Sequence, residues 1–265
     1  KGPKALFESE NNLVTEMGAW FPGERVVFRG KDLHHDLADM SWMELYLFGI
    51  TGRTFGVDEI KIFNSMWVLT SYPDARLWNN RVAALSTSSR STGILGIAAA
   101  IAVSEAAIYG AGPEIQAHDL LTTLKKQCRN GESNIESLIM AELKRSRVLP
   151  GFGRPVTQGD ERFEPLMKAL QSANIAVGKH LELAKDIESA LAKKKYPYRL
   201  NFAGATAAIA ADLGLTAREF YLFGALGFVA GMIPVLHLGN QKAAGAFFPA
   251  RCAAIQSETK SVRVW

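Results

Sequence analysis

The succession of helix start and stop signals constrains the fold of this chain more than any other feature. Ser41 and Glu44 form a capping box ahead of an apolar run, and Thr216 with Glu219 forms a second one. Between them, apolar residues recur at helical spacing, as over 57–69, and glycine or proline breaks end each run. The pattern predicts about ten helices and an all-α fold around a largely single core.

Two long apolar segments, 91–108 and 216–231, are predicted to form continuous helices. Their glycines and alanines indicate close helix packing, either within one core or at a subunit interface, and the sequence leaves both open. The stretch 220–241 contains no charged residue, but Pro234 interrupts it and its strictly apolar part ends at Leu236. We therefore expect a core helix and no membrane span. No convincing strand is apparent, and the one candidate is a short segment at 25–29 that stands almost alone.

The charge balance favours small anionic ligands over nucleic acid. Lys and Arg total 30 against 26 Asp and Glu, and the excess of +4 forms no clustered basic face. Cys128 and Cys252 lack metal-ligand spacing, which predicts a reduced, cytoplasmic protein without a disulfide framework. The His34-His35-Asp36 run is interpreted as a solvated loop, so no metal site is predicted.

Two polar breaks interrupt the apolar helices. In one, Gly151 and Gly153 allow a tight turn before Arg154, and Arg162 follows, so two guanidinium groups are available to hold carboxylates or phosphates. The alternative is an ordinary turn with solvated arginines. The other break, 70–76, carries groups that need hydrogen-bond partners, and its alternative is a structural Asp74–Arg76 or Asp74–Arg81 pair.

The order of these breaks resembles the citrate synthase superfamily, especially its short form, the citryl-CoA lyase module of ATP-citrate lyase. The resemblance runs from about Leu13 to the C-terminus. It rests on 20–23 and 29–30 near the start, the Tyr109-Gly110-Ala111-Gly112 stop, the loop 150–156 with Asp160 and Arg162, and Tyr196-Pro197 leading to Asn201-Phe202.

This resemblance implies an all-α fold with a large helical domain and a small mobile one. Residues 1–110 would form the first part of the large domain, 111–200 the small domain with the glycine-rich active-site loop, and 201–265 the return to the large domain. It further implies a homodimer or higher oligomer and binding of a coenzyme A thioester or polycarboxylate as substrate. No covalently bound cofactor is expected.

The sequence departs from the family where the family carries its catalytic groups. The resemblance aligns Tyr72 and Arg154 with two histidines and Asn201 with an aspartate that removes a proton from an acetyl thioester. Asn201 cannot act as a base and Arg154 stays cationic. We therefore predict that Tyr72 and Asp74 carry the proton chemistry, with Arg154 stabilising an oxyanion and Asn201 orienting the substrate.

The remaining predicted site residues bind substrate. Arg162 matches a carboxylate-binding arginine of the family, and Arg251 is a weaker match to another. Tyr109 lies where longer synthases carry a further histidine. Arg76, Gly151 and Gly153 complete the predicted binding set.

Together these features predict an enzyme that makes or breaks a carbon–carbon bond beside a carbonyl, with an altered catalytic set. Two alternatives stay open: a hydrolase or retro-Claisen lyase on the same scaffold, and a non-catalytic protein that binds acyl-CoA or polycarboxylates.

Overall fold

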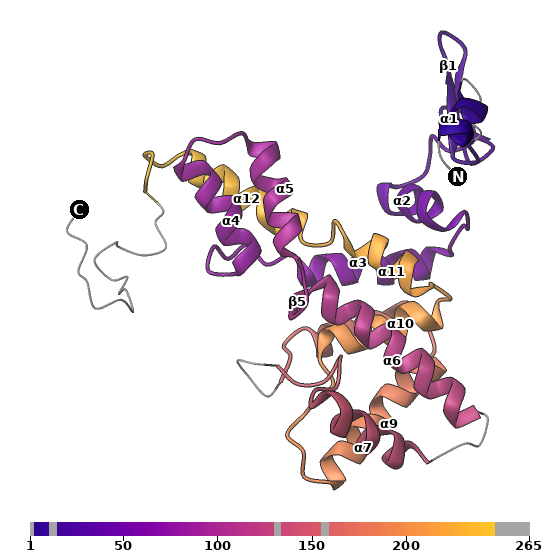
Figure 1. Ribbon diagram of the computed structural model, residues 1–265, viewed down its shortest axis with the longest axis vertical. Coiled ribbons are helices and arrows are strands. Elements are labelled where there is room, and N and C mark those ends of the chain that lie inside the picture. Colours follow the sequence, from indigo (N-terminus) through magenta and orange to yellow (C-terminus); the bar gives the residue numbers. More distant parts are fainter. Residues whose placement is uncertain (1–2, 11–14, 130–133, 155–158, 247–265) are drawn as a thin grey trace.

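The computed structural model describes residues 3–10, 15–129, 134–154 and 159–246 (Figure 1). The helices within these ranges are α1 (Pro3–Ser9), α2 (Trp42–Thr51), α3 (Val57–Thr70), α4 (Trp78–Ser88), α5 (Gly93–Val103), α6 (Ala111–Arg129), α7 (Ile135–Ser146), α8 (Phe163–Ser172), α9 (Lys179–Lys193), α10 (Phe202–Asp212), α11 (Ala217–Gly224) and α12 (Val229–Asn240). The prediction of an all-α fold is confirmed, and both predicted capping boxes form, at Ser41 and at Thr216.

The main hydrophobic core surrounds α10. From Ala205 to Ala210 every residue of this helix is buried, and small side chains let α6 and α9 pack closely on either side of it. Helices α2, α3, α7, α8 and α11 add the outer layer of the same core. This arrangement places the first residues of α10 at the edge of the core, beside the loop that precedes α8.

A second, smaller cluster joins α4, α5 and α12, which lie side by side as an arm at one end of the molecule (Figure 1). Ala83, Ala100 and Met232 form its buried centre. A Cβ on Gly96 of α5 would lie 2.1 Å from the Ser86 hydroxyl of α4, so this glycine serves packing within the chain.

The N-terminal region contains the candidate strand at 25–29 and two strands that were not predicted. Strands β1 (Gly18–Phe21), β2 (Arg25–Phe28) and β3 (Lys31–Asp32) form an antiparallel sheet that projects from the helices (Figure 1). The prediction of a lone strand at 25–29 was therefore incomplete. Its partners are short and mostly exposed, so they lack the buried alternation that marks a strand.

The predicted helix over 91–108 was too long. Helix α5 ends at Val103, and β4 (Glu105–Ala106) pairs with β5 (Tyr109–Gly110) in a short hairpin. Gly110 has φ +70°, and a Cβ there would lie 2.0 Å from the Ser104 carbonyl oxygen, so the hairpin requires glycine.

The predicted helix over 216–231 is two helices. Helix α11 ends at Gly224, and α12 begins at Val229 and includes Pro234 without ending there. By length and composition alone, Ala217–Asn240 is the one stretch in the described ranges that is long and apolar enough to cross a membrane, which is weak evidence for a span.

Candidate active site

A cavity of about 330 Å³ opens where the N-terminal ends of α4, α6 and α10 meet. Apolar side chains form much of its wall: Leu77, Trp78, Ile108, Phe202 and Phe228. Three arginines, Arg76, Arg154 and Arg162, contribute its positive charge, and Tyr72, Tyr109, Asn79, Asn80 and Glu114 contribute further polar groups. An apolar pocket with cationic groups suits a ligand that combines a carbon chain with carboxylates.

The glycine-rich loop forms part of the scaffold of this pocket. Gly151 and Gly153 have φ values of +85° and +79°. A Cβ on Gly151 would lie 2.7 Å from the Cα atom of Gly204 in α10. The loop therefore approaches α10 backbone to backbone, which sets the position of the arginine that follows.

Asn201 connects this loop to α10. Its side-chain oxygen accepts a hydrogen bond from the Gly204 N–H at 3.0 Å, and its amide donates to the Gly153 carbonyl at 2.7 Å. Asn201 is thus the N-cap of α10 and the tether of the loop. Both ends of its amide are engaged by the backbone.

Arg162 is held by a buried carboxylate. Asp160 accepts from the Nε and Nη2 atoms of Arg162, both at 2.8 Å, and from the Phe202 N–H at 2.9 Å. Burial alone would raise the pKa of Asp160, but the hydrogen bonds and charge of Arg162 lower it below 3.8. The Arg162 guanidinium also lies 4.4 Å from the Phe202 ring centroid, so its direction into the pocket is fixed.

Tyr72 and Arg154 meet at one carboxylate. The Tyr72 hydroxyl donates to Glu161 Oε1 at 2.5 Å, and Arg154 Nη1 donates to Glu161 Oε2. Burial, followed by this hydrogen bond, raises the pKa of Tyr72 to about 12. Burial would raise the pKa of Glu161, but hydrogen bonds from Tyr72 and Arg154 lower it to about 2. At neutral pH Tyr72 is therefore a hydrogen-bond donor and Glu161 is a carboxylate.

Asp74 lies outside the residues that line the cavity, although Arg76 lines it. Arg76 Nη2 and Nε donate to Asp74 at 2.7 and 3.0 Å, and these hydrogen bonds lower the pKa of Asp74 to about 2. A carboxylate this acidic is a weak base at neutral pH. The Asp74–Arg76 pair considered from sequence is present, whereas Arg81 Nε has no partner among the described residues.

Tyr109 closes the side of the pocket formed by the hairpin. Its hydroxyl donates to Asn79 Oδ1 at 3.0 Å, and its ring centroid lies 5.1 Å from that of Trp78. Asn80 donates to the carbonyl oxygens of Tyr72 and Asp74, which holds the segment before α4 in place.

Glu114 is a titratable residue of the pocket that was not predicted from the sequence. It lies in the first turn of α6, where a carboxylate is an ordinary helix-start residue, so its sequence position does not mark it as functional. Burial raises its pKa from 4.5 to about 7, and the charge of Arg162 offsets this only in part.

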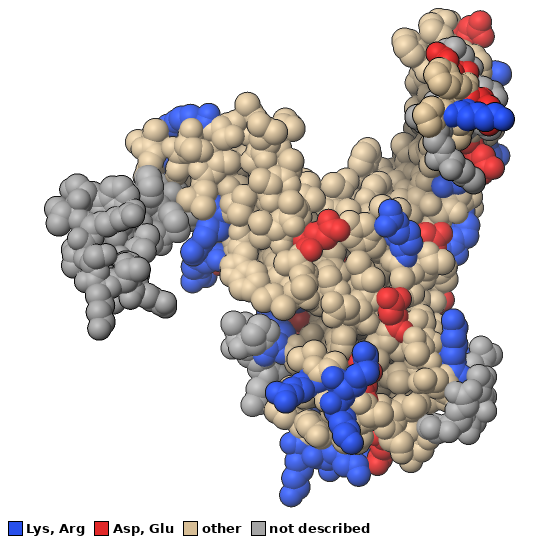
Figure 2. Space-filling model, in the orientation of Figure 1, with Lys and Arg blue, Asp and Glu red and all other residues tan. Residues whose placement is uncertain are grey.

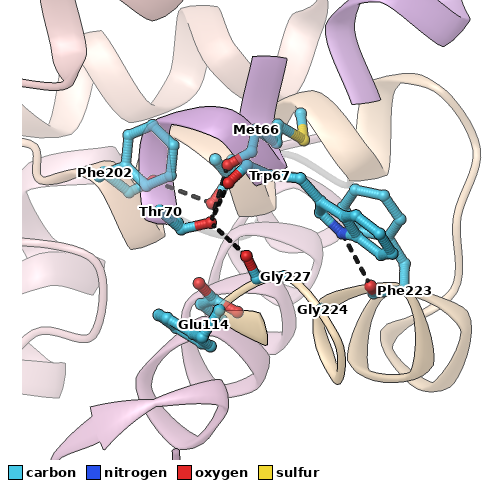
Figure 3. Close-up of a pocket in the computed structure, with 10 residues that line it drawn as sticks. Met66, Trp67, Thr70, Glu114, Phe202, Phe223, Gly224 and Gly227 are labelled. Atoms are coloured by element: carbon cyan, nitrogen blue, oxygen red, sulfur yellow. Dashed lines mark hydrogen bonds between the residues drawn. The ribbon is translucent and has the colours of Figure 1, made fainter. Parts of the chain in front are cut away.

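A small recess of about 20 Å³ shares Glu114 with the pocket. Thr70, Phe202 and Phe228 also line both spaces, and Figure 3 shows Thr70, Phe202 and Glu114 around the recess. Thr70 and Trp67 make hydrogen bonds to backbone carbonyls of 223–227 around the recess. Its size suits about one water molecule.

Arg251, a predicted binding residue, lies outside the described residues. Within those that the structure describes, no group of three or more His, Cys, Asp or Glu side chains could hold a metal ion.

No protein-family model and no curated protein matches the sequence. Solved structures do match. Citryl-CoA lyase from Hydrogenobacter thermophilus superposes with a TM-score of 0.81 at 18% identity, over 96% of this chain and 97% of the lyase. An ATP citrate lyase from Methanosaeta concilii in complex with (3S)-citryl-CoA gives 0.74 at 16% identity, over 98% of this chain and 44% of that protein.

Citrate synthase from Thermotoga maritima gives a TM-score of 0.64 at 18% identity, over 85% of this chain and 60% of the synthase. The chain therefore has the citrate-synthase fold. The chain covers nearly the whole length of a citryl-CoA lyase but only 60% of the synthase, so it has the short form of that fold.

Proposed function

We propose that this protein is an enzyme that makes or breaks a carbon–carbon bond next to the carbonyl of a coenzyme A thioester or polycarboxylate. The observation that supports this function is the apolar pocket at the starts of α4, α6 and α10, which three arginines line. The chain that carries it has the citrate-synthase fold. Carboxylates would bind the arginines, and the apolar wall would exclude water from the reacting carbons.

In this proposal Arg162, whose direction Asp160 fixes, binds a substrate carboxylate. Arg154 stabilises negative charge on a carbonyl oxygen, and Tyr72 donates a hydrogen bond when the ligand displaces it from Glu161. Tyr109 and Arg76 complete the site as binding groups, and Asn201 holds the loop that carries Arg154 in place. The division into 1–110, 111–200 and 201–265, the cytoplasmic location and the role of Arg251 stay predictions.

We include a homodimer in the proposal because the α4–α5–α12 arm has an exposed apolar surface. Ile94 and Leu95 of α5 are 83% and 64% exposed, and Ile233 and Leu238 of α12 are 51% and 54% exposed. Figure 2 shows that the side of this arm in view is largely uncharged. Clustered apolar side chains on adjacent helices are typical of a subunit interface, and a second copy of the chain is the proposed partner.

The test is to incubate the protein with acetyl-CoA and oxaloacetate, and separately with (3S)-citryl-CoA, and to identify products by mass spectrometry. A change in the carbon skeleton supports the proposal. Release of free coenzyme A with an unchanged acid would instead show a hydrolase, and calorimetric binding without turnover would show a binding protein. Arg162→Gln is expected to lose binding and turnover, whereas Arg145→Gln, in an exposed pair on α7, keeps both.

A further inference from the structure

Glu114 differs from the other carboxylates near the pocket because it has no partner. Asp160 is paired with Arg162, Glu161 with Arg154, and Asp74 with Arg76. Among the described residues, none makes a hydrogen bond or ion pair to the Glu114 carboxyl. A half-buried carboxyl that no protein group pairs is available to a ligand, unlike the three paired carboxylates.

The surroundings of Glu114 leave its carboxyl available to a ligand. It lines both the main cavity and the small recess, and Figure 3 shows the side chain directed towards Thr70 and the turn that follows α11. A Cβ on Gly224 would lie 3.2 Å from Glu114 Oε2, so this glycine leaves room for the carboxyl. Trp67, Phe223 and Phe228 make the recess mainly apolar.

The charged and titratable groups that share the cavity are Arg76, Arg154, Arg162, Tyr72 and Tyr109. None of these is a base at neutral pH, because the arginines stay cationic and burial raises the pKa of both phenols. A proton acceptor is therefore missing from the residues that the sequence predicted at this site, apart from Asp74, which lies outside the cavity lining.

We propose that Glu114 is the acid–base catalytic residue of this pocket and transfers the proton at the carbon next to the substrate carbonyl. This inference rests on the proposed function. The Glu114 carboxylate accepts a proton from that carbon: the C–H bond breaks, an O–H bond forms, and the electron pair moves into the enolate. The arginines stabilise the charge on the enolate oxygen. In the opposite direction the Glu114 carboxyl returns the proton to the carbon.

The ionisation of Glu114 suits this role. A pKa of about 7 gives both protonation states at neutral pH, which is the condition under which one group can accept and return a proton efficiently. The rate of proton abstraction should therefore rise with pH through about 7, as the carboxylate form becomes populated.

The experiment measures exchange of solvent deuterium into the methyl group of acetyl-CoA, with oxaloacetate present, by proton NMR. Wild type is compared with Glu114→Gln, Glu114→Asp and the matched control Asp119→Asn, which changes an exposed carboxylate on the same helix. We expect Glu114→Gln to slow exchange by about 10²–10⁴-fold and to lose the pH dependence near 7. Glu114→Asp should restore part of the rate, and Asp119→Asn should match wild type.

The outcomes separate this inference from the proposed function. If wild type exchanges and Glu114→Gln exchanges equally fast, the role of Glu114 is wrong and the proposed function stands. If wild type neither binds acetyl-CoA by calorimetry nor exchanges, the proposed function fails and the role of Glu114 fails with it. Carbon-13 NMR of the glutamate carboxyls measures the pKa of Glu114 without any substrate. A pKa at the ordinary value of 4.5 would also overturn the role of Glu114.

Discussion

Tyr72 and Glu161 are 89 residues apart in the sequence, yet the Tyr72 hydroxyl donates a 2.5 Å hydrogen bond to the Glu161 carboxylate. The same carboxylate binds Arg154. Tyr72 and Arg154 are the two residues that the resemblance aligns with histidines, and one acidic side chain connects them. Tyr72, Glu161 and Arg154 therefore form a connected network.

Glu161→Ala should lower the pKa of Tyr72 from about 12 while keeping it above 10, because burial persists when the hydrogen bond and negative charge are removed. Carbon-13 NMR of labelled tyrosine follows this titration, and Tyr72→Phe assigns the resonance. The matched control is Glu105→Ala, which removes the carboxylate hydrogen-bonded to Tyr221 and should lower the pKa of Tyr221 alone. An unchanged Tyr72 titration in Glu161→Ala would contradict the network.

The two Asp-x-Arg pairs of this site should differ greatly in their contribution to stability. Arg162→Met leaves Asp160, whose side chain is 1% exposed, without its bidentate partner, and should cost about 3–5 kcal/mol in urea denaturation. The double variant Asp160→Asn/Arg162→Met should lose less stability than the single variant Arg162→Met. Arg76→Met, in a pair whose side chains are 87% and 38% exposed, should have no measurable effect. Equal losses for Arg162→Met and Arg76→Met would show that burial does not set these contributions.

Gly151→Ala should destabilise the protein more than Gly23→Ala. Both glycines have positive φ, which costs an alanine about 1 kcal/mol. Gly23 has open space around it, whereas a Cβ at Gly151 meets the α10 backbone at 2.7 Å and adds about 1–3 kcal/mol of overpacking. Thermal unfolding of the two variants measures the difference, and similar losses would mean that the loop moves away from α10 without cost.

Glu114 should make stability fall with increasing pH. Its pKa is raised in the folded state, so between about 4.5 and 7 the folded protein binds more protons than the unfolded chain. The stability is present below about 4.5 and is lost as pH rises through about 7. Glu114→Gln should remove this loss and stabilise the protein at pH 8 by up to about 3 kcal/mol, with little effect at pH 4. Denaturant titrations at both pH values check this, and a gain of equal size at pH 4 would exclude ionisation as its cause.

Leu95→Glu should convert a dimer into monomers, because it places a charge in the exposed apolar surface of the arm. Light scattering at micromolar concentration gives the mass. Val68→Glu is the control, since Val68 is 72% exposed on α3, outside the arm. A wild-type protein that is already monomeric would remove the homodimer from the proposed function.

The sequence allowed prediction of those parts of the fold that depend on local signals. The capping boxes at Ser41 and Thr216 and the break at Gly110 are encoded within a few residues. Strands β1 and β3 and the division of 216–231 into two helices were missed, because short exposed strands and tight helix–helix turns carry weak local patterns. Tertiary packing decides both features.

The arginines of the candidate site were predictable because they follow a glycine turn. The acid–base properties of its carboxylates were not, because burial determines them. Arg154 and Arg162 do line one cavity with Tyr72 and Tyr109. The difference between Asp74 and Glu114 is invisible in sequence, since both are single acidic residues near helix starts. Only their surroundings distinguish them, because Asp74 is paired by Arg76 and Glu114 is desolvated without a partner.

The two hydrogen bonds of Asn201 make its replacement by aspartate unfavourable. A carboxylate at position 201 would still cap Gly204, but its second oxygen would face the Gly153 carbonyl oxygen, to which the Asn201 amide now donates at 2.7 Å. Two acceptors at that distance repel each other, so the loop would have to rearrange before the change was tolerated. A substitution of Asn201 by aspartate would therefore require the loop at Gly153 to be rebuilt, so residue 201 and this loop can change only together.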